Sequence, residues 1–137
     1  MQNIKATQGL SIRSDEGVNS QETTLDFEEL LLAFDNDADF VKELLTLYLT
    51  QSSPKLLSTI SQAIQSQNPQ LLEKAAHRLK GASGIIGAKQ ISMIASILEQ
   101  MGSQQTFTGA YEALQSLEQR LETLKKYVEG AIEGSLS

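Results

Sequence analysis

The chain has 137 residues and a formal net charge of −6, and it contains no cysteine and a single histidine. A chain of this length forms one domain whose core can fold without disulfides, and the lack of cysteine excludes disulfides and thiolate metal ligands. We expect no metal site, and the acidic balance argues against nucleic acid as a partner. No stretch approaches the ~20 apolar residues that cross a bilayer, and the N-terminus lacks the apolar run of a signal peptide. We therefore expect a cytoplasmic protein that does not bind membranes.

The N-terminal part of the chain divides into an arm and a short helix. Residues 1–23 are polar, show no sustained periodicity and are expected to form a flexible arm. Thr23 or Thr24 is a candidate cap for a helix that ends near Phe34, because acidic residues fill its first turn, where the helix dipole favours them. The apolar run 30–34 covers the whole circumference of this helix, so part of it should stay exposed and is also a candidate docking surface.

Four longer segments carry apolar residues at helical spacing. The first has Asp37 as its candidate N-cap and passes through Pro54, where we expect a kink rather than a break because the apolar pattern resumes at Leu56. The C-terminal stops of the next two segments are expected at Gly87 and at Gly102-Ser103. The four segments run from Asp37 to Gln67, from Pro69 to Ile86, from Lys89 to Met101 and from Gly109 to Ile132.

Amphipathic helices joined by short turns pack as antiparallel bundles. We predict an all-α fold, an antiparallel four-helix bundle with the short N-terminal helix capping one end. The bundle should span residues 24–132, and the tail 133–137 should fray.

One surface stripe combines the histidine with basic residues. His77 lies opposite the core face of its predicted helix, and Lys80 follows one turn later. Lys74 and Arg78 lie close by, and residues 73–89 hold four of the eleven basic residues but only one of the seventeen acidic ones. The stripe is therefore basic, although the chain as a whole is acidic.

The basic stripe around His77 suits phosphoryl transfer. Neutral imidazole is a nitrogen nucleophile at pH 7, and Lys80 can meet the negative charge of an arriving phosphoryl group. Gly81 and Gly84 leave the surface beside the histidine free of side chains, so a partner's active site can approach closely. Ile85 lies nearer the histidine side than the core side and can add an apolar contact.

Each feature also has a simpler interpretation. Most surface histidines have no special role, lysines on a helix face are usually solvated, and Gly-x-x-Gly is often a device for close helix packing. A serine hydrolase is excluded, because Ser83 faces the core and cannot meet His77.

The string from His77 to Ala88 resembles the signature of histidine-containing phosphotransfer (HPt) domains, roughly H-x-L-K-G-x-[SA]-x-x-x-G. The resemblance covers about Leu25–Val128 and includes the position of Pro54. It implies a four-helix bundle whose histidine relays phosphoryl groups between receiver domains. In this reading His77 is phosphorylated, Lys80 lies near the phosphoryl group, and Gly81 clears the docking surface.

The same resemblance implies a role for Glu99, which lies twenty-two residues after His77. Family members often place Gln or Glu there to hydrogen-bond the imidazole. A carboxylate would accept from Nδ1–H, leave Nε2 as the nucleophile and stabilise positive charge on the ring. The simpler interpretation of Glu99 is an ordinary solvated helix charge.

The resemblance also implies the partners, which are receiver domains of response regulators or of hybrid histidine kinases. The receiver supplies Mg²⁺ in an acidic pocket, so this chain needs no cofactor of its own. It would be a monomer without kinase or hydrolase activity. Two alternatives stay open: a non-catalytic helical adaptor, and the dimerisation and phosphoacceptor module of a histidine kinase. Against the second, Arg78 stands where such modules usually have an acidic residue.

Overall fold

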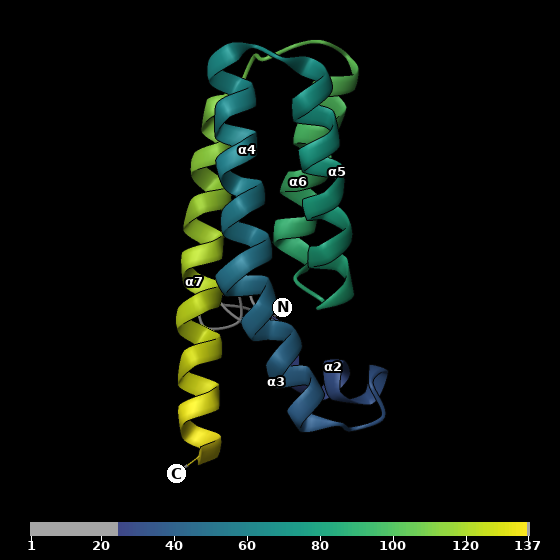
Figure 1. Ribbon diagram of the computed structural model, residues 1–137, viewed down its shortest axis with the longest axis vertical. Helices are drawn as coiled ribbons and strands as arrows, with labels where there is room; N and C mark the ends of the chain where they lie inside the picture. Colours follow the sequence, from purple (N-terminus) through teal and green to yellow (C-terminus); the bar gives the residue numbers. More distant parts are fainter. Residues whose placement is uncertain (1–24, 137) are drawn as a thin grey trace, which may run out of the picture.

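The structure is a computed structural model that describes residues 25–136, and Figure 1 shows its ribbon. The described residues contain no strand, and their elements are α2 (Phe27–Ala33), α3 (Ala38–Leu47), the π-helical turn η1 (Tyr48–Ser52), α4 (Ser53–Ser66), α5 (Pro69–Ile85), α6 (Lys89–Ser103) and α7 (Ala110–Leu136). Because α3, η1 and α4 follow one another without a break, they form one long helical unit. The predicted all-α class is confirmed.

The helices α4, α5, α6 and α7 run along the long axis of the molecule and pack as a bundle (Figure 1). The helix α5 lies against α6 and α4, and α7 closes the ring by packing on α4 and α6. At the lower end of the view, α3 extends beyond α4 and carries α2 beside it. The predicted helical bundle is confirmed. Within residues 25–136, no helix combines the length and the apolar character that crossing a membrane requires.

One apolar face of each long helix builds the core. In α5 the buried residues recur at helical spacing, and Leu72, Ala76 and Leu79 are fully buried. Burying a leucine side chain contributes about 1.5–3 kcal/mol to folding, so the apolar faces hold the bundle together. The other large side chains that are almost completely buried are Leu45, Ile60, Ile86, Ile91, Leu98, Leu117, Leu124, Val41 and Val128.

Side chains and one glycine define the helix ends. Asp26 caps α2, since its carboxylate accepts from the N–H groups of Glu28 and Glu29 at 3.0 and 3.2 Å. The predicted caps, Thr23 and Thr24, and the predicted arm, residues 1–23, lie outside the described residues. Asp26 acts as the N-cap of this helix. Asp37 caps α3 as predicted, with its carboxylate 3.0 Å from the N–H of Phe40, and Asn68 caps α5.

The C-terminus of α5 has the hydrogen bonds of a Schellman motif. Gly87 has a φ of +78°, and its N–H donates to the carbonyl of Gly84 while Ala88 N–H donates to the carbonyl of Ser83. The prediction that Gly87 stops this helix is confirmed.

Pro54 is accommodated by the π-helical turn that precedes it. The helix passes through the proline, as predicted, and the N–H of Ser53 donates to the carbonyl of Tyr48, five residues earlier. Proline has no N–H for the carbonyl four residues before it, and a π turn changes the hydrogen-bond pattern at this point without ending the helix. The sequence pattern did not predict the π turn.

The helix α6 ends at Ser103, within the predicted stop at Gly102-Ser103. Gly102 itself is helical and buried, and the residue with positive φ beyond the helix is Gln105, at 57°. The position of the stop is confirmed, but Gly102 serves helix packing rather than the turn. In α7 the helix continues past the predicted end at Ile132 and reaches Leu136.

A buried polar pair links the η1 turn to α5. The hydroxyl groups of Tyr48 and Ser83 lie 2.6 Å apart, and both residues are buried. Burial raises the pKa of Tyr48 to about 12, although the hydrogen bond with Ser83 opposes this change. The pair satisfies two hydroxyl groups that would otherwise be buried without partners.

We predict that Tyr48→Phe lowers the free energy of unfolding by about 1–2 kcal/mol, because Ser83 loses its buried partner. Urea unfolding at neutral pH measures this change, and Tyr111→Phe, at an exposed position, is the matched control. The raised pKa of Tyr48 contributes to the stability of the folded state. This contribution is fully present below pH 10.0, the pKa in the unfolded state, and is lost as the pH rises through about 12, the pKa in the folded state. The wild type should therefore lose more stability than Tyr48→Phe over that interval, and equal losses would contradict the assignment.

Candidate functional site

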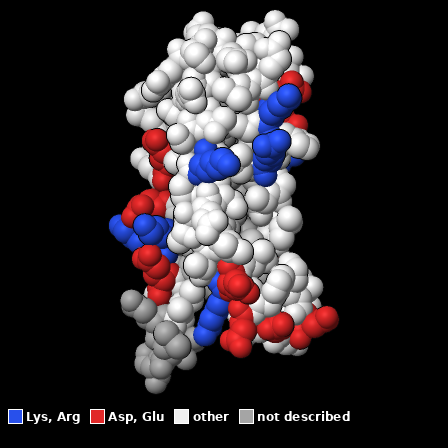
Figure 2. Space-filling view, in the orientation of Figure 1, with Lys and Arg blue, Asp and Glu red and all other residues white. Residues whose placement is uncertain are grey.

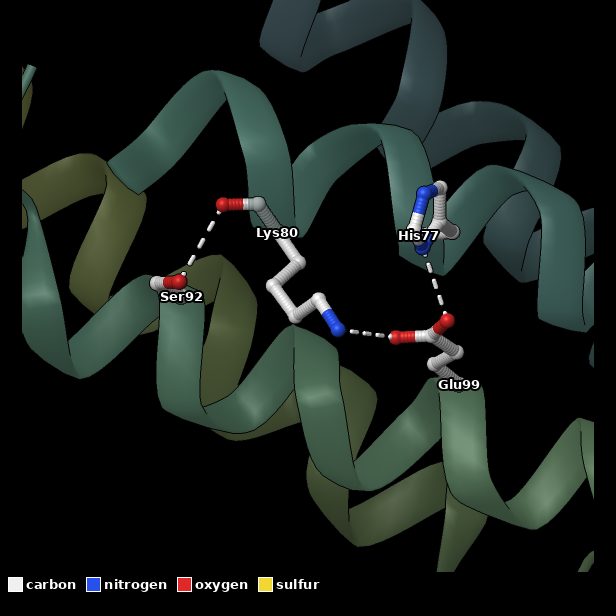
Figure 3. Close-up of polar contacts among 4 residues, drawn as sticks. All are labelled: His77, Lys80, Ser92 and Glu99. Atoms are coloured by element: carbon white, nitrogen blue, oxygen red, sulfur yellow. Dashed lines mark hydrogen bonds and ion pairs between the residues drawn. The ribbon is translucent and has the colours of Figure 1, made fainter. Parts of the chain in front are cut away.

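The candidate site lies where the exposed sides of α5 and α6 meet (Figure 3). His77 projects from α5 with 66% of its side chain exposed, and Glu99 projects from α6 with 21% exposed. His77 Nδ1 lies 2.8 Å from Glu99 Oε2. The contact between His77 and Glu99 is therefore present, although the helical spacing of α5 alone did not indicate it.

The second oxygen of Glu99 binds Lys80. Lys80 Nζ lies 2.7 Å from Glu99 Oε1 in an ion pair, and the lysine follows His77 by one turn of α5. The carboxylate of Glu99 thus bridges two residues of the facing helix (Figure 3). The structure brings together all three residues that were predicted to act at the site: His77, Lys80 and Glu99.

The bridge favours the ionised form of Glu99. The hydrogen bond from Lys80 lowers the pKa of Glu99 most, partial desolvation opposes this effect, and the hydrogen bond from His77 lowers the pKa further. An ionised carboxylate can only accept hydrogen bonds. The proton in the contact with His77 therefore resides on Nδ1.

A neutral imidazole with its proton on Nδ1 has a free lone pair on Nε2. No hydrogen bond to Nε2 occurs among the described residues, and the side chain of His77 is largely exposed. Nε2 is consequently an accessible nucleophile.

The surface beside His77 is free of side chains, as predicted. Gly81 and Gly84 are exposed, and a Cβ atom added to either would meet no atom within 4 Å. The two glycines are therefore not required for close packing between the helices that the structure describes. Ile85, 60% exposed, and the exposed Lys74 and Arg78 complete the predicted contact surface on α5.

The charges are unevenly distributed over the face in Figure 2. Lys and Arg cluster on the upper right, over α5, and Asp and Glu gather at the lower end, over α2 and α3, whereas both signs are mixed along the left edge, over α7. The helix that carries His77 thus presents a mainly basic surface within an acidic protein.

Three further residues of α6 were not predicted from the sequence. Ser92 on α6 donates a hydrogen bond from its hydroxyl group to the backbone carbonyl of Lys80, at 3.1 Å (Figure 3). Met93 and Ile97 on α6 are large apolar side chains that stay 57% and 46% exposed. A signal for these two was available, because they are the apolar residues of α6 left over once its core positions are assigned.

Within residues 25–136, no group of three or more His, Asp or Glu residues is arranged to hold a metal ion. The expectation that the chain has no cofactor of its own stays a prediction.

Comparison with known proteins identifies the family. The family model described as the Hpt domain matches residues 43–127, which is more than half of the chain and includes His77, Lys80 and Glu99. Histidine-containing phosphotransfer protein 1 of Arabidopsis thaliana is 29% identical over 101 residues, which cover 67% of this chain and 65% of that protein. No solved structure gave a significant match. The chain belongs to the Hpt domain family, as the sequence motif predicted, and it spans about 65% of the length of this curated relative.

We predict that Lys80→Ala raises the pKa of Glu99, because the lysine is the main cause of its low value. Titration of the Glu99 carboxyl carbon by NMR measures the pKa. Lys126→Ala, which removes a cation 4.0 Å from Glu122 on α7, is the control and should leave Glu99 unchanged. An unchanged pKa in Lys80→Ala would show that the ion pair does not form in solution.

The same shift makes folding stability depend on pH. A lowered carboxyl pKa stabilises the fold above the unfolded value, and that contribution is lost as the pH falls through the folded value. The wild type should therefore lose more stability than Lys80→Ala as the pH falls from the unfolded to the folded pKa of Glu99, because the variant lacks this contribution at every pH.

Proposed function

We propose that this protein accepts a phosphoryl group on Nε2 of His77 from an aspartyl phosphate of one receiver domain and passes it to the aspartate of another. The observation that carries the proposal is the bridge from Glu99 to His77 Nδ1 and Lys80 Nζ. Membership of the Hpt domain family supports a phosphotransfer role, and the geometry supports the identity of the reacting atom.

The nucleophile in the proposed step needs no general base, because Nε2 carries no proton. The lone pair of Nε2 attacks phosphorus, an N–P bond forms, and the P–O bond to the receiver's aspartate breaks with its electron pair leaving on the carboxylate. The ring becomes positively charged, and Glu99 stabilises that charge through Nδ1–H. Transfer to a second receiver reverses these bond changes.

Lys80 is proposed to stabilise the phosphoryl group. A phosphoryl group brings nearly two negative charges, and the lysine ammonium lies one turn from His77. An ammonium group has three N–H donors, so Lys80 can bind phosphoryl oxygen while it keeps a hydrogen bond to Glu99. Its role requires neither a metal ion nor a nucleotide site in this chain.

The partner is proposed to dock over the glycines of α5. Gly81 and Gly84 offer clearance for an in-line approach, and Ile85 offers an apolar contact. Lys74 and Arg78 give this surface a charge opposite to that of an acidic receiver pocket, which would hold the Mg²⁺. Met93 and Ile97 are further exposed apolar side chains, on α6.

The monomeric state, the cytoplasmic location and the lack of independent kinase or hydrolase activity are parts of this proposal. A receiver domain of either a response regulator or a hybrid histidine kinase fits the proposed surface equally well.

The proposal is tested by incubating the protein with a receiver that carries a labelled aspartyl phosphate. Wild type should acquire label that is stable in alkali and labile in acid, and His77→Gln should acquire none. Lys80→Ala should keep its helix content but transfer about tenfold or more slowly, since one charged group that stabilises the transferred phosphoryl is lost. Lys126→Ala on α7 is the control for loss of a lysine. Absence of label with several receivers would favour the helical adaptor and would contradict the proposal.

A further inference from the structure

The backbones of α5 and α6 touch at Gly102. A Cβ atom added to Gly102 would lie 2.6 Å from the backbone nitrogen of Glu73, 2.9 Å from its Cα and 2.7 Å from the carbonyl oxygen of Pro69. All three are backbone atoms, so a side-chain rotation cannot make room. Any larger residue at this position must move one helix away from the other.

This contact lies next to the candidate site. Glu99 precedes Gly102 by three residues on α6, and His77 follows Glu73 by four residues on α5. Because the two helices are antiparallel, both steps lead by about one turn in the same direction. The backbone contact therefore determines how far the Glu99 carboxylate lies from the His77 ring.

A second contact fixes the helices on the other side of the site. The hydroxyl group of Ser92 on α6 donates to the backbone carbonyl of Lys80 on α5, at 3.1 Å (Figure 3). Gly102 and Ser92 thus hold α5 and α6 together on either side of Glu99. Gly102 lies inside the last turn of α6 without a positive φ, so the turn does not require a glycine there and packing explains it.

We propose that Gly102 and Ser92 are positioning residues that set the separation and register of α5 and α6 at which Glu99 binds both His77 and Lys80. The consequence for phosphotransfer rests on the proposed function, whereas the consequence for the Glu99 contacts does not. Both residues act through Glu99 rather than by touching the reacting group.

The distances show how sensitive the bridge is to this contact. The closest approach of an added Cβ, 2.6 Å, is about 0.8 Å short of an ordinary contact at 3.4 Å. The two hydrogen bonds of Glu99 measure 2.8 and 2.7 Å, so a separation of that size would lengthen both beyond a normal hydrogen bond. Glu99 must then adopt new side-chain torsions to restore either bond.

The experiment compares Gly102→Ala with the wild type in the full-length protein. The first readout is the ¹⁵N spectrum of the His77 ring, which reports the nitrogen that carries the proton, together with the carboxyl titration of Glu99. The second is single-turnover phosphotransfer at saturating receiver, with the receiver Kd measured separately. Gly130→Ala is the matched control, because a Cβ atom there meets nothing within 4 Å.

In Gly102→Ala, we expect a mixture of both ring tautomers, a raised pKa of Glu99, transfer slowed roughly tenfold to a hundredfold, and a Kd within about twofold of the wild-type value. Ser92→Ala should show the same changes to a smaller extent, and Ser92→Thr, which keeps the hydroxyl group, should restore the wild-type result. Gly130→Ala should match the wild type in every readout.

A Gly102→Ala protein that is less stable but keeps the wild-type tautomer and Glu99 pKa would overturn the proposal, because the glycine would then serve packing alone. If Gly102→Ala does not fold, Ser92→Ala decides, and a wild-type tautomer in that variant overturns the proposal. If the wild type accepts no phosphoryl group, the proposed function fails, while the NMR readouts still decide whether these residues position Glu99.

Discussion

The carboxylate of Glu99 binds two residues of the facing helix, one with each oxygen, and the chemistry of the site depends on this arrangement. Lys80 lowers the pKa of the carboxylate, the ionised carboxylate keeps the proton of His77 on Nδ1, and Nε2 is left free. None of these steps works without α5 and α6 in register. The register depends in turn on the buried faces of both helices and on the backbone contact at Gly102.

The bundle places this site on a surface rather than in a cleft. Its core is filled by aliphatic side chains, and His77 stays largely exposed. An exposed nucleophile is well suited to a reaction in which the partner brings the phosphoryl group, the metal ion and the enclosing pocket. The two exposed glycines of α5 fit the same use, since a glycine inside a helix costs about 0.5–1 kcal/mol relative to alanine and these two relieve no clash with any residue from 25 to 136.

Much of this organisation is predictable from the sequence, because it depends on spacing along single helices. The core face of α5, the outward direction of His77, the cap at Asp37 and the stop at Gly87 follow from helical periodicity and local backbone preferences. Contacts between helices are less accessible to such reasoning. Helical spacing placed His77 opposite the core, and only the family resemblance indicated that Glu99 on α6 would reach it. The packing role of Gly102 was not predicted, because a glycine that ends a helix and a glycine that lets two helices touch look alike in sequence. Ser92 gave no signal, since its partner is a backbone carbonyl.

The central claim is that Glu99 directs the phosphoryl group to Nε2 of His77, and the most direct test is a ¹H–³¹P correlation spectrum of the phosphorylated protein. Nε2 lies between two ring carbons that carry hydrogen, whereas only one of the ring carbons bonded to Nδ1 does. Phosphorus on Nε2 should therefore show correlations to both ring protons of His77. A correlation to a single ring proton would place the phosphoryl group on Nδ1 and would contradict the account.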